Sequence, residues 1–295
     1  MGPGPESTRI RRPAPEVPGR PLGVRWIHGS VSAKHNTDPE IQVHRYDEHT
    51  VILRQNKAVD YEAPFMFLLF GEARAVLIDT GATEADEFFP LRAVVDDLMA
   101  EWLETHPRDR YQLVVLHTHS HHDHVAGDGQ FLDRPDTTVV PAGASDAYGF
   151  LGLTDDLDRP APLDLGARVL ECIASPGHDS AAISFYDPFT GFLLTGDTVY
   201  PGRLYVRDWP AFVATVDRLV SFAESHPVSH VLGCHIEMST TPGEDYPIRS
   251  IHQPDEAPLE MSVDQLRDVS RAAHEIVDGP GRYVYPDFVI HHLAP

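Results

Sequence analysis

Cysteine, basic side chains and long apolar runs are all scarce in this 295-residue chain. Its two cysteines, Cys172 and Cys234, allow at most one disulfide bond, so we expect reduced, buried thiols and a cytoplasmic location. No run of about 18 apolar residues occurs, which predicts that the chain does not cross a membrane. A domain of this size buries a sizeable core and needs no disulfide bonds for its stability.

Basic side chains are outnumbered, with 23 Lys and Arg against 45 Asp and Glu and a formal net charge of −22. Nucleic-acid binding requires basic patches, and the sequence has no Lys or Arg cluster beyond its first residues, so we expect no nucleic-acid partner. An acidic surface also keeps a protein in solution, which explains the charge equally well. The expected partner is a small-molecule substrate, and the sequence leaves open whether the chain is a monomer or a homodimer.

The first 23 residues are almost free of aliphatic side chains and carry prolines at positions 3, 5, 13, 15, 18 and 21. This composition predicts a disordered leader over residues 1–23. We expect the main domain to span residues 24–258, and residues 259–295 to form a C-terminal helix and tail packed on it. Residues 240–258 are rich in proline, glycine and acidic side chains, so they predict a loop that is either a lid or a fixed connection.

Short aliphatic and β-branched runs alternate with helical patterns from about residue 41 onwards. The predicted helices are Glu84–Glu104, with Phe88 on its apolar face, Trp209–Ser225 and Val263–Val277. This mixture indicates an α/β protein in which helices cover the sheets. The predicted strands are Thr50–Leu53, Phe65–Phe70, Ala75–Ile78, Leu113–Leu116, Val139–Val140, Val169–Ala174, Ala182–Tyr186, Phe192–Thr195 and His230–Gly233.

The strongest chemical signal is the run from His117 to His124, which holds five histidines and one aspartate directly after an apolar run. Neutral histidine and aspartate are standard ligands for zinc, and close spacing lets one segment supply several of them. An extended or turning backbone places His119 and His121 on the same side, whereas a helix would separate them. We therefore expect metal ligands on a loop that leaves a strand.

Three further polar residues each follow a predicted strand. His178 follows Val169–Ala174, Asp197 follows Phe192–Thr195, and His235 follows His230–Gly233. A protein core does not readily hold so many histidines and aspartates without partners, and a shared cation satisfies them. These positions therefore join the predicted metal site.

Taken together, these motifs resemble those of the metallo-β-lactamase superfamily, over roughly residues 41–240. The resemblance implies an αββα sandwich of two mixed β-sheets flanked by helices, with metal ions at one edge. The motifs in chain order are Leu77-Ile78-Asp79-Thr80-Gly81, His119-x-His121-x-Asp123-His124, Pro176-Gly177-His178, Thr195-Gly196-Asp197-Thr198 and Gly233-Cys234-His235.

The resemblance also implies a complete set of metal ligands, similar to that of the hydroxyacylglutathione hydrolase and lactonase branches. Two zinc ions are the expected cofactor, with iron or manganese as the alternatives. Asp79 is implied to orient a ligand histidine. Cys234, one residue before a ligand, is interpreted as a core side chain. The first metal would take His119, His121 and His178, the second Asp123, His124 and His235, and Asp197 would bridge them.

The reaction that such a site predicts is hydrolysis, because two adjacent dications generate a bridging hydroxide at neutral pH and polarise a carbonyl. Asp123 or Asp197 is the candidate for carrying a proton to the leaving group. Tyr200 follows Asp197 by three residues and either hydrogen-bonds the developing oxyanion or packs in the loop. Candidates for contacting a carboxylate or phosphate of the substrate are Arg203, Arg207 and Arg249.

The attacked bond is left open among a small-molecule ester, a thioester and a lactone. One alternative is an oxidoreductase with a single iron, similar to the persulfide dioxygenases of the same fold. Another is a binding or regulatory protein, which an intact ligand set disfavours. Hydrolysis of β-lactams as a side activity is a further alternative.

Overall fold

A computed structural model describes residue 10 and residues 21–294. Most of the predicted leader, residues 1–9 and 11–20, therefore lies outside the described residues. Where this stretch is described it contacts the domain. Ile10 is buried and its N–H donates to Glu72 Oε1 (3.1 Å), while the N–H of Leu22 donates to Glu260 Oε1 (2.9 Å). Among the described helices, none is long and apolar enough to cross a membrane.

The first sheet has six strands in the order β1-β2-β3-β4-β5-β6. The pairs from β1 to β4 are antiparallel, whereas β5 pairs in parallel with both β4 and β6. The strands are Ile41–Asp47 (β1), Thr50–Gln55 (β2), Phe65–Phe70 (β3), Arg74–Ile78 (β4), Gln112–Leu116 (β5) and Thr137–Val139 (β6).

The second sheet also has six strands, in the order β13-β12-β10-β9-β8-β7. Strands β10 and β12 run parallel and the other pairs are antiparallel, so both large sheets are mixed. The strands are Ala161–Asp164 (β7), Val169–Ala174 (β8), Ile183–Asp187 (β9), Phe192–Gly196 (β10), His230–Gly233 (β12) and Glu260–Met261 (β13).

A third, smaller sheet has the order β11-β15-β14, with strands Arg203–Val206 (β11), Gly281–Val284 (β14) and Val289–His292 (β15). The α-helices are Leu91–Thr105 (α1), His122–Val125 (α2), Ala144–Leu151 (α3), Trp209–Ser225 (α4) and Val263–Glu275 (α5). Two short 3₁₀ helices are Ala33–His35 (η1) and Ala126–Gln130 (η2).

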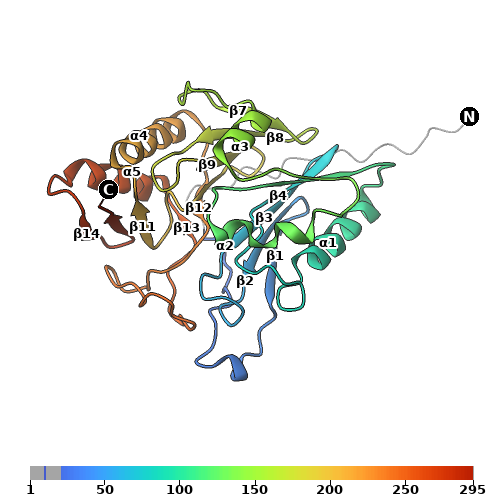
Figure 1. The fold of residues 1–295 in the computed structure, drawn as a ribbon, viewed down its shortest axis with the longest axis horizontal. Helices are drawn as coiled ribbons and strands as arrows, with labels where there is room; N and C mark the ends of the chain where they lie inside the picture. The colour runs from blue at the N-terminus through green and yellow to red at the C-terminus, as the bar shows by residue number, and fades with distance from the viewer. Residues whose placement is uncertain (1–9, 11–20, 295) are drawn as a thin grey trace, which may run out of the picture.

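The two large sheets pack face to face, with α1 on the outer side of the first and α4 and α5 on the outer side of the second (Figure 1). Strand β3 shows how the layers arise. Successive side chains of a strand point to opposite faces, so Phe67 joins the core between the sheets and Leu68 joins the core under α1. Phe212 of α4 packs on the far side of the second sheet. The predicted αββα sandwich is confirmed.

The helix predicted over Glu84–Glu104 begins later, at Leu91. Pro90 occupies the position before the first helical residue, and a proline disfavours helical backbone in the residue that precedes it. As a result Phe88, which was predicted on the apolar face, is 59% exposed, whereas Phe89 is buried. Helix α4 has the predicted bounds, and α5 ends at Glu275 rather than Val277.

The C-terminal region contains more than the predicted helix and tail. Strand β13 adds to the second sheet, and β15 pairs in parallel with β11. These strands are short, and β14 alternates between half-buried and exposed residues, so no apolar run indicated it. Residues 240–258 lack regular structure apart from isolated bridges, among them Ser239 with Glu256 and Gly29 with His252.

Candidate metal centre

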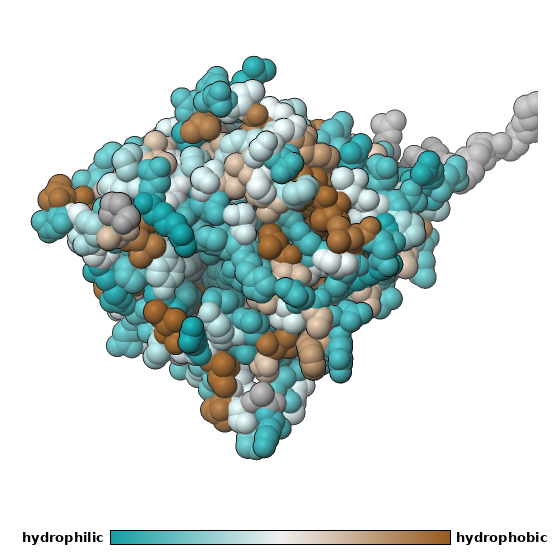
Figure 2. Space-filling model, in the orientation of Figure 1, coloured by the Kyte–Doolittle hydropathy of each residue, from teal (hydrophilic) through white to brown (hydrophobic). Residues whose placement is uncertain are grey.

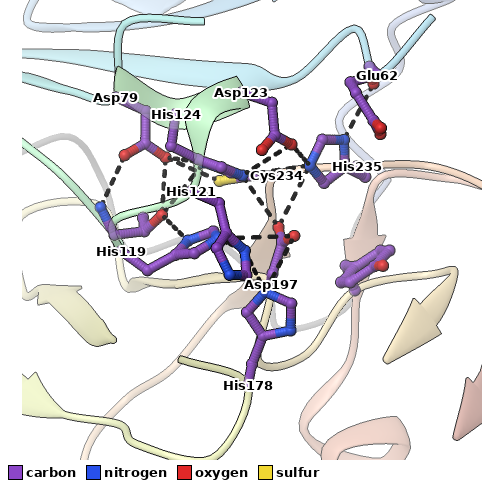
Figure 3. Close-up of polar contacts among 12 residues, drawn as sticks. Glu62, Asp79, His119, His121, Asp123, His124, His178, Asp197, Cys234 and His235 are labelled. Carbon is purple, nitrogen blue, oxygen red and sulfur yellow. Dashed lines mark hydrogen bonds and ion pairs between the residues drawn. The ribbon is translucent and has the colours of Figure 1, made fainter. Parts of the chain in front are cut away.

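The seven predicted ligands meet at one edge of the sandwich, where strands of both large sheets end (Figure 3). Strand β5 leads into the histidine run, β8 into His178, β10 into Asp197 and β12 into His235. His119 and His121 lie on the expected loop, whereas Asp123 and His124 belong to the short helix α2.

Two glycines let these loops approach their neighbours closely. Gly177, next to His178, has φ +143°, and a Cβ atom there would lie 2.6 Å from Cα of Phe212 in α4. Gly196, next to Asp197, has φ +52°, and its Cβ would lie 2.6 Å from Cβ of Thr118. Backbone at positive φ favours glycine, so both residues permit turns that aim the following side chain at the centre.

The first donor set consists of His119, His121 and His178. Nε2 of His119 and Nε2 of His178 each lie 3.0 Å from Nδ1 of His121. In two of these histidines the other ring nitrogen contacts a residue that is not a donor. His178 Nδ1 lies 2.7 Å from the carbonyl of Tyr205, and His119 Nδ1 lies 3.1 Å from Oγ1 of Thr118. These contacts orient the rings so that one nitrogen faces the centre.

The second donor set consists of Asp123, His124, Asp197 and His235. Oδ2 of Asp123 lies 3.3 Å from Nε2 of both His124 and His235. Asp197 faces both sets. Its Oδ1 is 3.3 Å from Nε2 of His235, and its Oδ2 is 3.7 Å from Nε2 of His178. The carboxylate of Asp197 is thus placed between the two sets, as the resemblance implied.

The donors fit a pair of metal ions. Tetrahedral ions with bonds of about 2.0 to 2.1 Å hold their donor atoms about 3.3 Å apart, and the second set has this spacing. Oδ1 of Asp197 is buried and accepts no hydrogen bond from the described residues, although His124 and His235 lie beside it. A buried carboxylate oxygen without a donor is costly, and a cation supplies the missing partner.

The electrostatics of the two sets differ. Burial lowers the pKa of His119 and His178, which keeps these imidazoles neutral. In the second set burial also opposes charge, but the neighbouring carboxylates raise the pKa of His235 to about 9 and that of His124 well above its ordinary value. Protons on these imidazoles balance the carboxylates, and a bound cation would displace them.

Asp79 anchors the centre from behind. Its Oδ1 accepts a hydrogen bond from the backbone N–H of Thr118 (2.7 Å). Its Oδ2 accepts hydrogen bonds from the hydroxyl of Thr118 (2.9 Å) and the thiol of Cys234 (3.3 Å). Oδ2 also lies 2.9 Å from Nδ1 of His124. Asp79 is fully buried and has φ +68°, a backbone conformation that costs energy for a residue other than glycine.

A cleft of about 210 Å³ opens onto both sets and is the route by which a substrate would reach them. Besides five of the ligands, its lining includes Tyr200, Tyr205 and Leu293, together with the charged residues Glu62, Arg207 and Glu237. No motif indicated Glu62 or Glu237 from the sequence. The carbonyl of Glu62 also holds Nδ1 of His235 (3.0 Å).

Four other residues of the sequence motifs are placed as follows. Tyr200 is buried beside His235, and its hydroxyl donates to the carbonyl of Arg203, so its role toward an oxyanion stays a prediction. Cys234 is buried in the core between the sheets and also touches Asp79. His117 is buried and His122 is exposed, and neither belongs to the two donor sets.

Comparison with known sequences finds relatives that are named hydroxyacylglutathione hydrolase. Hydroxyacylglutathione hydrolase of a Synechococcus species is 32% identical over 138 residues, 45% of this chain and 55% of that protein. The enzyme of that name from Nostoc punctiforme is 28% identical over 169 residues, 55% of this chain and 61% of that protein. The chain therefore spans little more than half the length of these curated relatives.

Solved structures show the same fold. A metallo-beta-lactamase from Pontibacter korlensis has a TM-score of 0.52 at 17% sequence identity, covering 80% of this chain and 99% of that one. The metallo-beta-lactamase DIM-1 has a TM-score of 0.53 at 14% identity, covering 81% of this chain and 99% of that one.

The family model of the metallo-beta-lactamase superfamily matches residues 60–276, a span that includes all seven donors. Because this match covers more than half of the chain and agrees with the fold, the chain belongs to the metallo-beta-lactamase superfamily.

Proposed function

We propose that this protein is a dinuclear metal-dependent hydrolase of a small-molecule thioester, ester or lactone. The observation that carries the proposal is the pair of donor sets sharing Asp197 at the floor of an open cleft. Two zinc ions are the proposed cofactor, with iron or manganese as alternatives. The relatives named hydroxyacylglutathione hydrolase favour a thioester among the three bonds.

The residues of the cleft have distinct tasks in this proposal. Bound by the two sets, divalent ions would activate water at neutral pH and polarise the carbonyl under attack. In this proposal a water attacks directly, so no side chain is required as the nucleophile. Asp123 lines the cleft, and its side chain is 21% exposed, so it can pass a proton to the leaving group. Asp197, at the floor of the cleft, is the alternative carrier.

Metal analysis and a substrate panel test this function together. The purified protein should contain two metal ions per chain and hydrolyse at least one member of a panel of thioesters, esters, lactones and β-lactams. Asp197→Asn should lose both metal and activity, whereas Asp217→Asn should keep them, because this control residue in α4 contacts Ser270 and His274 of α5 and belongs to neither donor set. One iron per chain, oxygen consumption on a persulfide and no hydrolysis would instead support the iron oxidoreductase.

A further inference from the structure

A second, smaller pocket adjoins the metal cleft. It holds about 60 Å³ and lies between the loop after β2, which carries Lys57 and Glu62, and residues 247–253 of the long loop after β12. Glu62, Tyr205 and Glu237 line both the pocket and the metal cleft, so the two are immediate neighbours. A volume of this size suits a carboxylate group or about two waters at about 30 Å³ each.

Lys57 gives the pocket an unusual donor. Its side chain is buried, with the residue only 4% exposed, and its ammonium donates one hydrogen bond, to the carbonyl of Tyr61 (3.1 Å). Among the described residues, no carboxylate oxygen lies within ion-pair distance of Nζ. An ammonium has three donors and is costly to bury without an opposite charge, so an anionic ligand would satisfy both needs.

The surrounding charges leave the pocket positive. Three cationic side chains and two carboxylates line it, in a chain of net charge −22. Arg203 is already paired with Glu237 and Asp245. Arg249 forms no ion pair in the described part of the chain, and its backbone is held at φ +65°. In the described part of the chain, Lys57 and Arg249 are therefore the lining cations without an ion pair, although the guanidinium of Arg249 lies over the ring of Tyr61 (6.0 Å to its centroid).

A polar atom in the same pocket also lacks a partner. Gln253 is 3% exposed, and its Oε1 accepts no hydrogen bond from the described residues. A buried amide oxygen without a donor is uncommon. It would accept a hydrogen bond from a water, or from an N–H or O–H group of a ligand that fills the pocket.

We infer that this pocket is a subsite for a carboxylate on the substrate, remote from the bond that is cleaved. Lys57 and Arg249 would donate to the carboxylate, while the scissile carbonyl lies in the metal cleft. The inference rests on the proposed hydrolysis and narrows the substrate to thioesters, esters or lactones that carry a second, anionic group. It assigns Lys57 and Arg249 to substrate selection rather than to bond cleavage.

Matched thioesters test the subsite. In one pair the acyl group is glutaryl, which ends in a carboxylate, or its neutral amide analogue glutaramoyl. In a second pair the terminal carboxylate or carboxamide is carried by the thiol part of the thioester instead. Hydrogen bonds to a charged group contribute enough for about 10- to 100-fold discrimination. The wild type should prefer the carboxylate member of at least one pair by this factor in kcat/KM, mainly through KM. Equal rates within both pairs would overturn the subsite.

Two variants and one control connect the preference to the residues. Lys57→Met, which keeps the length of the aliphatic chain, should abolish the preference, and Arg249→Gln should reduce it. Lys34→Met, a lysine on the surface, should leave it intact. Arg249 is exposed, so its variant decides the matter if Lys57→Met does not fold. An unchanged preference in both variants would contradict the assignment.

Glutarate binding provides a readout that does not need hydrolysis. Calorimetric titration of the purified, metal-containing protein with sodium glutarate should show binding that is at least tenfold weaker in Lys57→Met than in Lys34→Met. Binding of glutarate without cleavage of any thioester would keep the subsite and reject the hydrolase. Cleavage of both members of each pair at equal rates, with no effect of Lys57→Met on glutarate binding, would keep the hydrolase and reject the subsite.

Discussion

The tautomer of His124 depends on Asp79, and this dependence predicts the effect of Asp79→Asn. Oδ1 must remain an oxygen because it accepts the backbone N–H of Thr118 (2.7 Å). The NH₂ of an asparagine would therefore replace Oδ2, opposite Nδ1 of His124, where the carboxylate oxygen lies at 2.9 Å. To accept from this NH₂, His124 must move its proton to Nε2, which is the nitrogen that faces Asp123 and Asp197.

An imidazole protonated at Nε2 cannot coordinate a metal through that atom. Loss of an orienting partner of this kind typically weakens metal binding about 10- to 100-fold. We expect the larger loss at the second site, because Asp79 contacts the ring of His124 directly. It reaches the first set only through the hydroxyl of Thr118, which lies 3.1 Å from Nδ1 of His119. Competition with a chromophoric zinc chelator should show one ion bound at least tenfold more weakly than in the wild type and the other ion weakened less.

A matched control separates this effect from a general loss of stability. Asp187, the last residue of β9, is also a buried aspartate, and it pairs at 2.6 Å with Arg168, the residue before β8. Breaking such a buried pair costs about 3 to 5 kcal/mol, so Asp187→Asn should lower the free energy of unfolding without changing zinc affinity. If Asp79→Asn bound two zinc ions as tightly as the wild type, the argument from the His124 tautomer would be refuted.

Three further predictions concern metal removal, Tyr200 and pH. Chelation should abolish activity and lower Tm, because the buried donors lose their shared partner, and added zinc should restore both; an unchanged Tm would contradict the metal-filled centre. If the phenol of Tyr200 donates to the oxyanion, Tyr200→Phe should lower kcat about tenfold or more at unchanged metal content. Unchanged kinetics would refute that role. Burial lowers the pKa of His49 to about 4, so between pH 6.5 and 4 the unfolded chain binds a proton that the native chain does not, and stability falls as pH falls through this window. Between pH 7 and 5 the wild type should lose about 2 kcal/mol more than His49→Asn in urea unfolding, and equal losses would rule out His49 as the cause.

Much of the sandwich could be predicted because its strands are continuous apolar runs. Phe65–Phe70 is buried on both faces, so its sequence is apolar throughout and its bounds are the predicted ones. The ligands were visible for a related reason: each follows such a run directly, and strand ends from one sheet edge converge. One exception was helix α1, where the apolar pattern extended across Pro90 into a segment that the proline keeps out of the helix.

The sequence by itself determined the apolar strands at the centre of both large sheets and predicted the seven candidate donors, since both depend on side chains at local spacing. Only the tertiary structure decided how the donors are held and what lies beside them. The carbonyls of Glu62 and Tyr205 orient His235 and His178, and a backbone carbonyl has no signature in sequence because every residue has one. Lys57 and Arg249 are nearly 200 positions apart and meet in one pocket only because the loops after β2 and β12 pack together, a contact that no local pattern records.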